Sequence, residues 1–124
     1  FRAENIDWWK NVKLRGVPAW WGGEIAANKL TNYLNPTTFT IYVDPHYRAE
    51  LLRDLVAKHR VRLRADPKGD IEILDRFWNL PETPHNPDCT PPLLVYADLM
   101  ATLQPRNIET AALVRDKLLH DAPR

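Results

Sequence analysis

The segment FTIYVDPHYRAELLRDLVA, residues 39–57, carries the clearest structural signal in the chain. Its first five residues are mostly β-branched or aromatic and predict a strand. Asp44 followed by Pro45 is typical of a helix N-cap with proline at the first helical position. An apolar stripe then predicts a helix that buries one face, formed by Leu51, Leu52, Leu55 and Val56.

Apolar and basic residues alternate after this helix: Val61, Leu63 and Ala65 lie between Arg60, Arg62 and Arg64. This alternation predicts a second strand with the three arginines on one face, about 6.6 Å apart. Turn residues at 66–69 lead to a third expected strand at 71–74. Strand, helix and strand over 39–65 predict a parallel βαβ unit, and the third strand is expected to return as a hairpin.

The flanking segments predict mainly helices. A short helix or arm is expected at 7–14, a helix over 24–34, and two closing helices over 93–103 and from Pro105 onward. Five prolines between 80 and 92 predict an irregular connector. The expected fold class is α/β or α+β, a small mixed sheet of about three strands packed with about four helices.

Composition restricts the possible functions. The 124 residues predict a single domain, 1–124, and 17 Lys and Arg against 16 Asp and Glu give a net charge of +1. This balance argues against coating DNA by bulk charge, and the sequence has no apolar run long enough to span a bilayer. One cysteine, Cys89, indicates a reducing compartment, and the start at Phe1 indicates an excised domain or part of a longer chain.

Signals for catalysis are weak. The chain has no serine, and the neighbouring Asp88 is expected to raise the pKa of the thiol of Cys89, which argues against a catalytic cysteine. His85, Asp88 and Cys89 lie close together but lack the second ligand pair of a zinc site. No metal and no cofactor is therefore expected.

Two features have competing interpretations. Gly22 and Gly23 precede a helix and have backbone amides suited to an anion. The favoured interpretation is a tight turn while Trp20 or Trp21 packs on the core. Asp70 and Glu72 are the two acids of a metal-dependent nuclease pattern, but Leu74 occupies the position of its lysine. Cross-strand pairing of Glu72 with Arg62 or Arg64 is the stronger interpretation.

Two groups of charged residues and one pair of tryptophans are the remaining candidates for functional sites. Residues 46–68 hold seven Lys or Arg against three acids, so Arg60, Arg62 and Arg64 are candidates for phosphate contacts. The alternative is a solvated sheet face. Asp98, Arg106 and Glu109 are expected to form a structural polar clamp between the two closing helices. Exposed Trp8 and Trp9 are candidate anchors for a partner.

Several blocks of the sequence, in order, resemble one known family. The blocks are residues 21–27, 30–31, 34–36, 40–43, 69–74 with Phe77 and Trp78, 92–99, and 106–111. Together they resemble the AbiEi family of antitoxins and transcriptional regulators of type IV, abortive-infection toxin–antitoxin systems. One departure is the Leu103-Gln104 corner, where glycine and a small polar residue are expected.

The resemblance implies a non-enzymatic, cytoplasmic bacterial regulator with no catalytic residues. It implies operator DNA as a partner, mainly through an N-terminal winged helix–turn–helix that this chain lacks. It also implies a nucleotidyltransferase-like toxin that is neutralised without a stable complex, and help in DNA binding from the part of the protein present here. The remaining alternative is a degenerate nuclease using Asp70 and Glu72 with a divalent metal.

Overall fold

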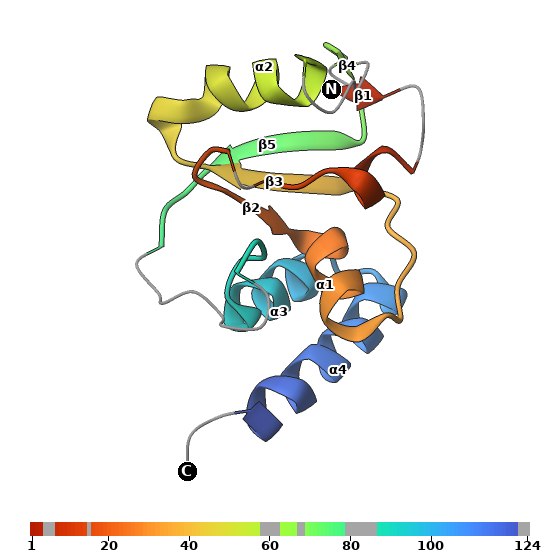
Figure 1. Ribbon diagram of the computed structural model, residues 1–124. Helices are drawn as coiled ribbons and strands as arrows, with labels where there is room; N and C mark the ends of the chain where they lie inside the picture. Colours follow the sequence, from red (N-terminus) through yellow and green to blue (C-terminus); the bar gives the residue numbers. More distant parts are fainter. Residues whose placement is uncertain (4–6, 15, 58–62, 67–68, 79–86, 122–124) are drawn as a thin grey trace.

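The computed structural model of the chain describes residues 1–3, 7–14, 16–57, 63–66, 69–78 and 87–121. Its strands are β1 (Arg2–Ala3), β2 (Ala19–Gly22), β3 (Phe39–Val43), β4 (Leu63–Arg64) and β5 (Ile71–Asp75). Its helices are α1 (Gly23–Thr31), α2 (Arg48–Ala57), α3 (Pro92–Ala101) and α4 (Pro105–Asp121), with 3₁₀ turns η1 (Trp8–Asn11) and η2 (Pro45–Tyr47). These described elements confirm the expected class, small mixed sheets combined with helices (Figure 1).

The larger sheet has the order β2-β3-β5, with β2 antiparallel and β3 and β5 parallel. The expected parallel unit is present, but its second strand is β5, and among the described residues β4 and β5 do not pair as the expected hairpin. β4, the described part of the arginine strand, instead pairs with β1 in a separate two-stranded sheet. Ile71 and Ile73 explain this choice, because they bury apolar side chains beside β3 whereas Arg64 is exposed.

Helices cover both faces of the larger sheet. Figure 1 shows α2 on one side of it and α1, α3 and α4 on the other. β3 is buried along its whole length, as expected for a central strand covered on both faces. The predicted cap is present, because the side chain of Asp44 accepts a hydrogen bond from the N–H of His46 at 3.0 Å, but it caps the 3₁₀ turn η2, and α2 begins only at Arg48.

The two N-terminal tryptophans belong to the core. Trp8 and Trp9 are each only 7% exposed, so the expectation that they are exposed anchors for a partner is wrong. The ring of Trp8 lies 5.8 Å from that of Trp21 and 5.7 Å from that of Phe39. Packing these large aromatic side chains on apolar residues of the sheet removes them from water, and this burial stabilises the fold.

Two residues with left-handed backbone end helices. Asn32 (φ 56°) terminates α1, earlier than the expected stop at Asn35 and Pro36, and Tyr33 is consequently exposed instead of lying on the apolar stripe. Leu103 (φ 57°) forms the corner between α3 and α4, at the position where the family resemblance leads one to expect glycine. Because the residue is a leucine, the left-handed backbone at this corner carries a steric cost of about 1 kcal/mol.

Candidate functional site

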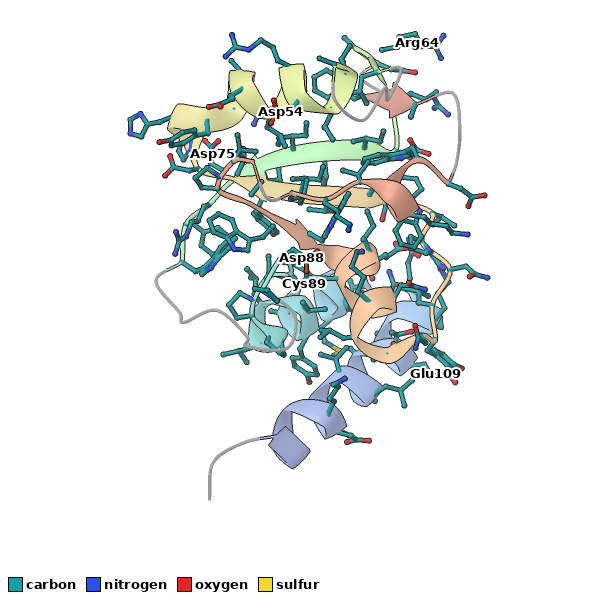
Figure 2. The ribbon with its side chains drawn as sticks, in the orientation of Figure 1. Asp54, Arg64, Asp75, Asp88, Cys89 and Glu109 are labelled. Atoms are coloured by element: carbon teal, nitrogen blue, oxygen red, sulfur yellow. The ribbon has the colours of Figure 1, made fainter. Side chains whose placement is uncertain are left out.

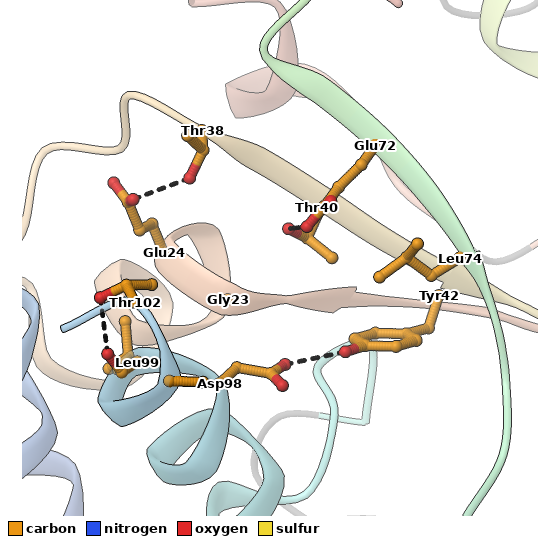
Figure 3. A pocket seen from close by; sticks show the side chains of 11 residues that line it. Gly23, Glu24, Thr38, Thr40, Tyr42, Glu72, Leu74, Asp98, Leu99 and Thr102 are labelled. Atoms are coloured by element: carbon orange, nitrogen blue, oxygen red, sulfur yellow. Dashed lines mark hydrogen bonds between the residues drawn. The ribbon is translucent and has the colours of Figure 1, made fainter.

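A pocket of about 180 Å³ opens between one face of the larger sheet and α3 (Figure 3). The residues that line it come from the start of α1, from β3 and β5 with Thr38, and from α3 with Thr102: Gly23, Glu24, Thr38, Thr40, Tyr42, Glu72, Leu74, Asp98, Leu99, Ala101 and Thr102. Most of the lining residues carry acidic or hydroxyl side chains, and the acids among them are Glu24, Glu72 and Asp98.

The sheet half of the pocket follows from strand alternation. Thr40 and Tyr42 on β3 pair in register with Glu72 and Leu74 on β5, so the four side chains share one face. The alternate residue Ile73 is buried on the opposite face. The alternating pattern of β5 thus places a carboxylate beside the central strand.

Asp98 extends from α3 toward the sheet, where its Oδ2 accepts a hydrogen bond from the Tyr42 hydroxyl at 2.9 Å (Figure 3). Burial raises the pKa of Asp98, and the nearby charge of Glu72 raises it further, whereas the hydrogen bond from Tyr42 lowers it. Burial, and then the charge of Asp98, likewise raise the pKa of Tyr42. The tyrosine therefore remains a hydrogen-bond donor at neutral pH.

Glu72 is the second acid of the sheet side. Its Oε1 accepts a hydrogen bond from Thr40 Oγ1 at 2.8 Å. No basic side chain lines the pocket among the described residues, and no ion pair joins Glu72 or Asp98 to a basic residue of that part of the chain. Two carboxylates thus face the same space with only hydroxyl groups as partners.

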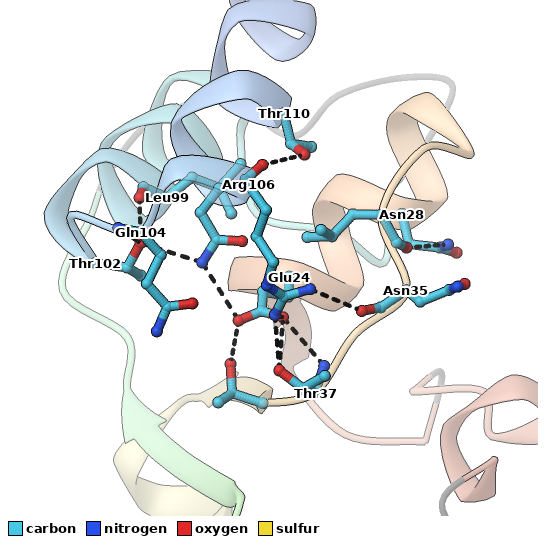
Figure 4. A network of polar contacts seen from close by, with 12 residues as sticks. Glu24, Asn28, Asn35, Thr37, Leu99, Thr102, Gln104, Arg106 and Thr110 are labelled. Atoms are coloured by element: carbon cyan, nitrogen blue, oxygen red, sulfur yellow. Dashed lines mark hydrogen bonds and ion pairs between the residues drawn. The ribbon is translucent and has the colours of Figure 1, made fainter.

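Glu24, at the other end of the pocket, has a very different environment (Figure 4). Its side chain is 4% exposed and pairs with Arg106 Nη2 at 2.5 Å. Further donors to its carboxylate are the N–H of Thr37 at 3.1 Å, the hydroxyl of Thr38 at 2.7 Å and the amide of Asn107 at 3.4 Å. Burial alone would raise the pKa of Glu24, but these hydrogen bonds and Arg106 together lower it.

Arg106 connects three segments through this network. Besides Glu24, it donates to the hydroxyl of Thr37 at 2.7 Å and to the carbonyl of Asn35 at 3.2 Å. It therefore ties α4 to α1 and to the connection between α1 and β3. A buried carboxylate with this many donors holds local geometry strongly, because each donor would otherwise lose a partner.

The structure gives the three residues of the expected clamp different partners. Asp98 contacts Tyr42 on β3, Arg106 contacts Glu24 on α1, and Glu109 accepts a hydrogen bond from the Tyr33 hydroxyl at 2.7 Å. The expected pairing of Asp98 with Arg106 is therefore wrong. Asp98 points toward the sheet in Figure 3, whereas Arg106 points toward α1 in Figure 4.

A family model described as transcriptional regulator, AbiEi antitoxin, type IV toxin–antitoxin system, matches residues 1–120. The chain belongs to the AbiEi antitoxin family. A transcriptional regulator of such a system has DNA and a toxin as partners. No curated protein and no solved structure matches the chain.

Of the three candidate arginines of this antitoxin-family chain, the described one, Arg64, is not among the residues that line the pocket. The described helices include none with the length and apolar character needed to cross a bilayer. Arg60 and Arg62 lie outside the described residues, while the side chain of Arg64 is 72% exposed and lies 3.9 Å from Asp66 (Figure 2). Glu72 contacts Thr40 instead of Arg64, so that expected cross-strand pair is wrong, and Arg62 lies outside the described residues.

The nuclease pair is not brought together in the pocket. Glu72 lines it, whereas Asp70 precedes β5 and is not among the lining residues. The backbone carbonyl of Asp70 accepts a hydrogen bond from the N–H of Phe39 at 2.8 Å. The acid that faces Glu72 across the pocket is Asp98, which was expected to belong to the clamp with Arg106 and Glu109.

Cys89 is buried beneath the end of β2, where Trp21 forms a β-bridge with it (Figure 2). Burial, with a further contribution from Asp88, raises the pKa of its thiol to about 12. A thiol with this pKa is a poor nucleophile at neutral pH. His85 lies outside the described residues, and in the part that is described no three His, Cys, Asp or Glu side chains are grouped closely enough for a metal ion.

The two glycines at the junction of β2 and α1 form the expected tight turn. Gly23 has φ +53°, a conformation that side chains disfavour, and Trp21 is fully buried. A Cβ at Gly22 would lie 2.6 Å from the Tyr42 ring. The missing side chain at Gly22 therefore makes room for the tyrosine that reaches Asp98.

Proposed function

We propose that this chain is a non-enzymatic regulatory domain of a type IV antitoxin and transcriptional regulator, acting by binding in the bacterial cytoplasm. The observation that carries the proposal is the lining of the pocket. Its described side chains offer carboxylates and hydroxyl groups but no activated nucleophile, and no cation lies beside Glu72 or Asp98 among the described residues. Catalytic sites usually combine such groups, whereas an uncompensated acidic pocket is suited to recognition.

We further propose that Arg60, Arg62 and Arg64 assist operator binding by contacting phosphates. Arg64 supports this role, because it is exposed and pairs in register with Arg2 on β1. Both guanidinium groups share Asp66, at 3.1 Å from Arg2 and 3.9 Å from Arg64, so the region retains excess positive charge. The cognate toxin, a nucleotidyltransferase-like protein, would be neutralised without a stable complex.

The salt dependence of DNA binding tests the arginine role. We expect weak binding of duplex DNA whose log affinity falls with log salt, and a slope smaller by about 2.7 in the Arg60, Arg62 and Arg64 triple alanine variant, since each lost phosphate contact removes about 0.9. A triple variant of Arg48, Arg53 and Arg115 to alanine is the control for net charge. Equal slopes for the wild type and the Arg60, Arg62, Arg64 variant would contradict the phosphate role.

The same samples test the alternative function. Labelled DNA and RNA incubated with magnesium or manganese should stay intact. Cleavage that Glu72→Gln abolishes would replace the regulatory proposal with a metal-dependent nuclease. Asp70→Asn would then show whether Asp70 takes part, despite its position outside the pocket lining.

A further inference from the structure

We propose that the pocket described above binds an arginine side chain presented by a protein partner, with an apolar neighbour of that arginine packing on Phe77. The contact lies on a different face from Arg64 and goes beyond the proposed function. Its failure would leave the DNA proposal untouched, because the two have different probes and different variants.

The size of the pocket favours a single side chain. Its volume of about 180 Å³ is below the several hundred Å³ of a usual small-molecule site. A cavity of roughly 150 Å³ holds one benzene molecule, so this pocket has room for the end of one long side chain. A helix or strand of a partner would have to remain outside and insert one residue.

The charge of the pocket selects the kind of side chain. Glu72 and Asp98 face the space without a cationic partner among the described residues, and Thr40 and Tyr42 already donate their hydroxyl protons to these acids. The inserted group must therefore supply donors and positive charge. A guanidinium group has five N–H donors and no acceptor, in a planar arrangement that suits carboxylates.

The contacts of Arg76 exclude this arginine as an internal occupant of the pocket. Arg76 follows β5, but its guanidinium lies 4.7 Å from the centre of the Trp20 ring and 5.6 Å from that of Trp78. Its Nε donates to the Trp78 carbonyl at 3.2 Å. Arg76 is thus already held beside these rings and does not line the pocket.

An apolar rim adjoins the acids. Phe77 is 71% exposed, although its ring packs against Tyr42 at 6.0 Å and Trp78 at 5.7 Å. Leu74, 37% exposed, lines the pocket itself. An aromatic side chain that is held in place and yet exposed is typical of protein-binding hot spots, and two nearby carboxylates disfavour a nucleic-acid phosphate at the same place.

Amide NMR of the whole chain tests the proposal with two probes, acetyl-arginine amide and the peptide acetyl-Arg-Leu-amide. We expect saturable shifts at Thr40, Tyr42, Glu72 and Asp98. The matched neutral probes with citrulline in place of arginine should bind about tenfold more weakly or worse, which corresponds to about 1.4 kcal/mol. Glu72→Gln and Asp98→Asn should each weaken both arginine probes.

Two further variants separate charge from shape. Asp75→Asn removes an acid of β5 that does not line the pocket, and it should leave binding unchanged. Phe77→Ala should weaken the leucine-containing peptide several-fold while leaving acetyl-arginine amide unaffected. The spectrum of each variant verifies its fold.

Three results would overturn the proposal. The first is the absence of saturable shifts at these residues, and the second is equal binding of the arginine and citrulline probes. The third is saturable binding of magnesium or spermidine that excludes the arginine probes, which would assign the pocket to a free cation. If Asp75→Asn lost as much binding as Asp98→Asn, the binding would depend on overall charge and not on the pocket.

Discussion

Glu24→Gln is expected to lower the free energy of unfolding at pH 7 by about 3 kcal/mol, because it removes one member of a buried, hydrogen-bonded ion pair. The carboxylate of Glu24 receives donors from Arg106, Thr37, Thr38 and Asn107. A glutamine side chain has one acceptor oxygen, and its NH₂ group would face some of these donors. Arg106 is 39% exposed and regains part of its hydration, which limits the loss.

Urea denaturation followed by tryptophan fluorescence measures this cost. Glu109→Gln is the matched control, because Glu109 is an exposed acid on α4 whose Oε1 accepts from Tyr33. Its effect should stay within about 0.5 kcal/mol. If the two variants lost equal stability, the Glu24 network would not hold α4 to α1.

The free energy of unfolding that Glu24→Gln loses should depend on pH in one direction, decreasing as the pH falls. The pKa of Glu24 is lowered below its ordinary value of 4.5 in the folded protein. The unfolded state therefore binds the proton more tightly, and the stability that Glu24 contributes is present above pH 4.5 and lost as the pH falls through the folded pKa. The difference between wild type and Glu24→Gln should shrink over that acidic range.

Gly22→Ala is expected to cost about 2 kcal/mol, a typical value for overpacking a closed site. The new Cβ would lie 2.6 Å and 2.8 Å from two carbons of the Tyr42 ring. Tyr42 is 4% exposed, its ring centre lies 5.1 Å from that of Trp78, and its hydroxyl bonds Asp98, so the ring has little room to move. The substitution should also shift the amide signals of Asp98.

A double-mutant cycle checks the cause of this cost. In a Tyr42→Leu background the ring is gone, so Gly22→Ala should cost at least about 1 kcal/mol less than in the wild type. An equal cost in both backgrounds would show that contact with Tyr42 is not what makes the glycine necessary.

Local signals in the sequence predicted local structure well. The run at 39–43, the Asp44 cap and the proline at the start of α4 all specify elements through their own backbone and neighbours. The tight turn at Gly22 and Gly23, with Trp20 or Trp21 packing on the core, was also predicted from neighbouring residues, and both tryptophans are buried. These features depend on propensity and capping within a few residues.

Pairings across the chain were not predictable in this way. Glu24 and Arg106 are 82 positions apart, and Tyr42 and Asp98 are 56 apart. The expected clamp paired Asp98 with Arg106, which is the next basic residue along the chain. The strand partner of β3 was misassigned because alternation identifies a strand without identifying its neighbour.

The charge of Glu24 is compensated within the chain, by Arg106 and its hydrogen-bond donors, whereas Asp98, beside Glu72, is left for a cationic partner. A ¹³C NMR titration of the side-chain carboxyl carbons measures both groups in one sample. We expect the pKa of Asp98 to lie above its ordinary 3.8 and that of Glu24 below its ordinary 4.5. A pKa for Asp98 at or below 3.8 would contradict this difference between the two acids, because it would mean that a cation or further donors already compensate this carboxylate.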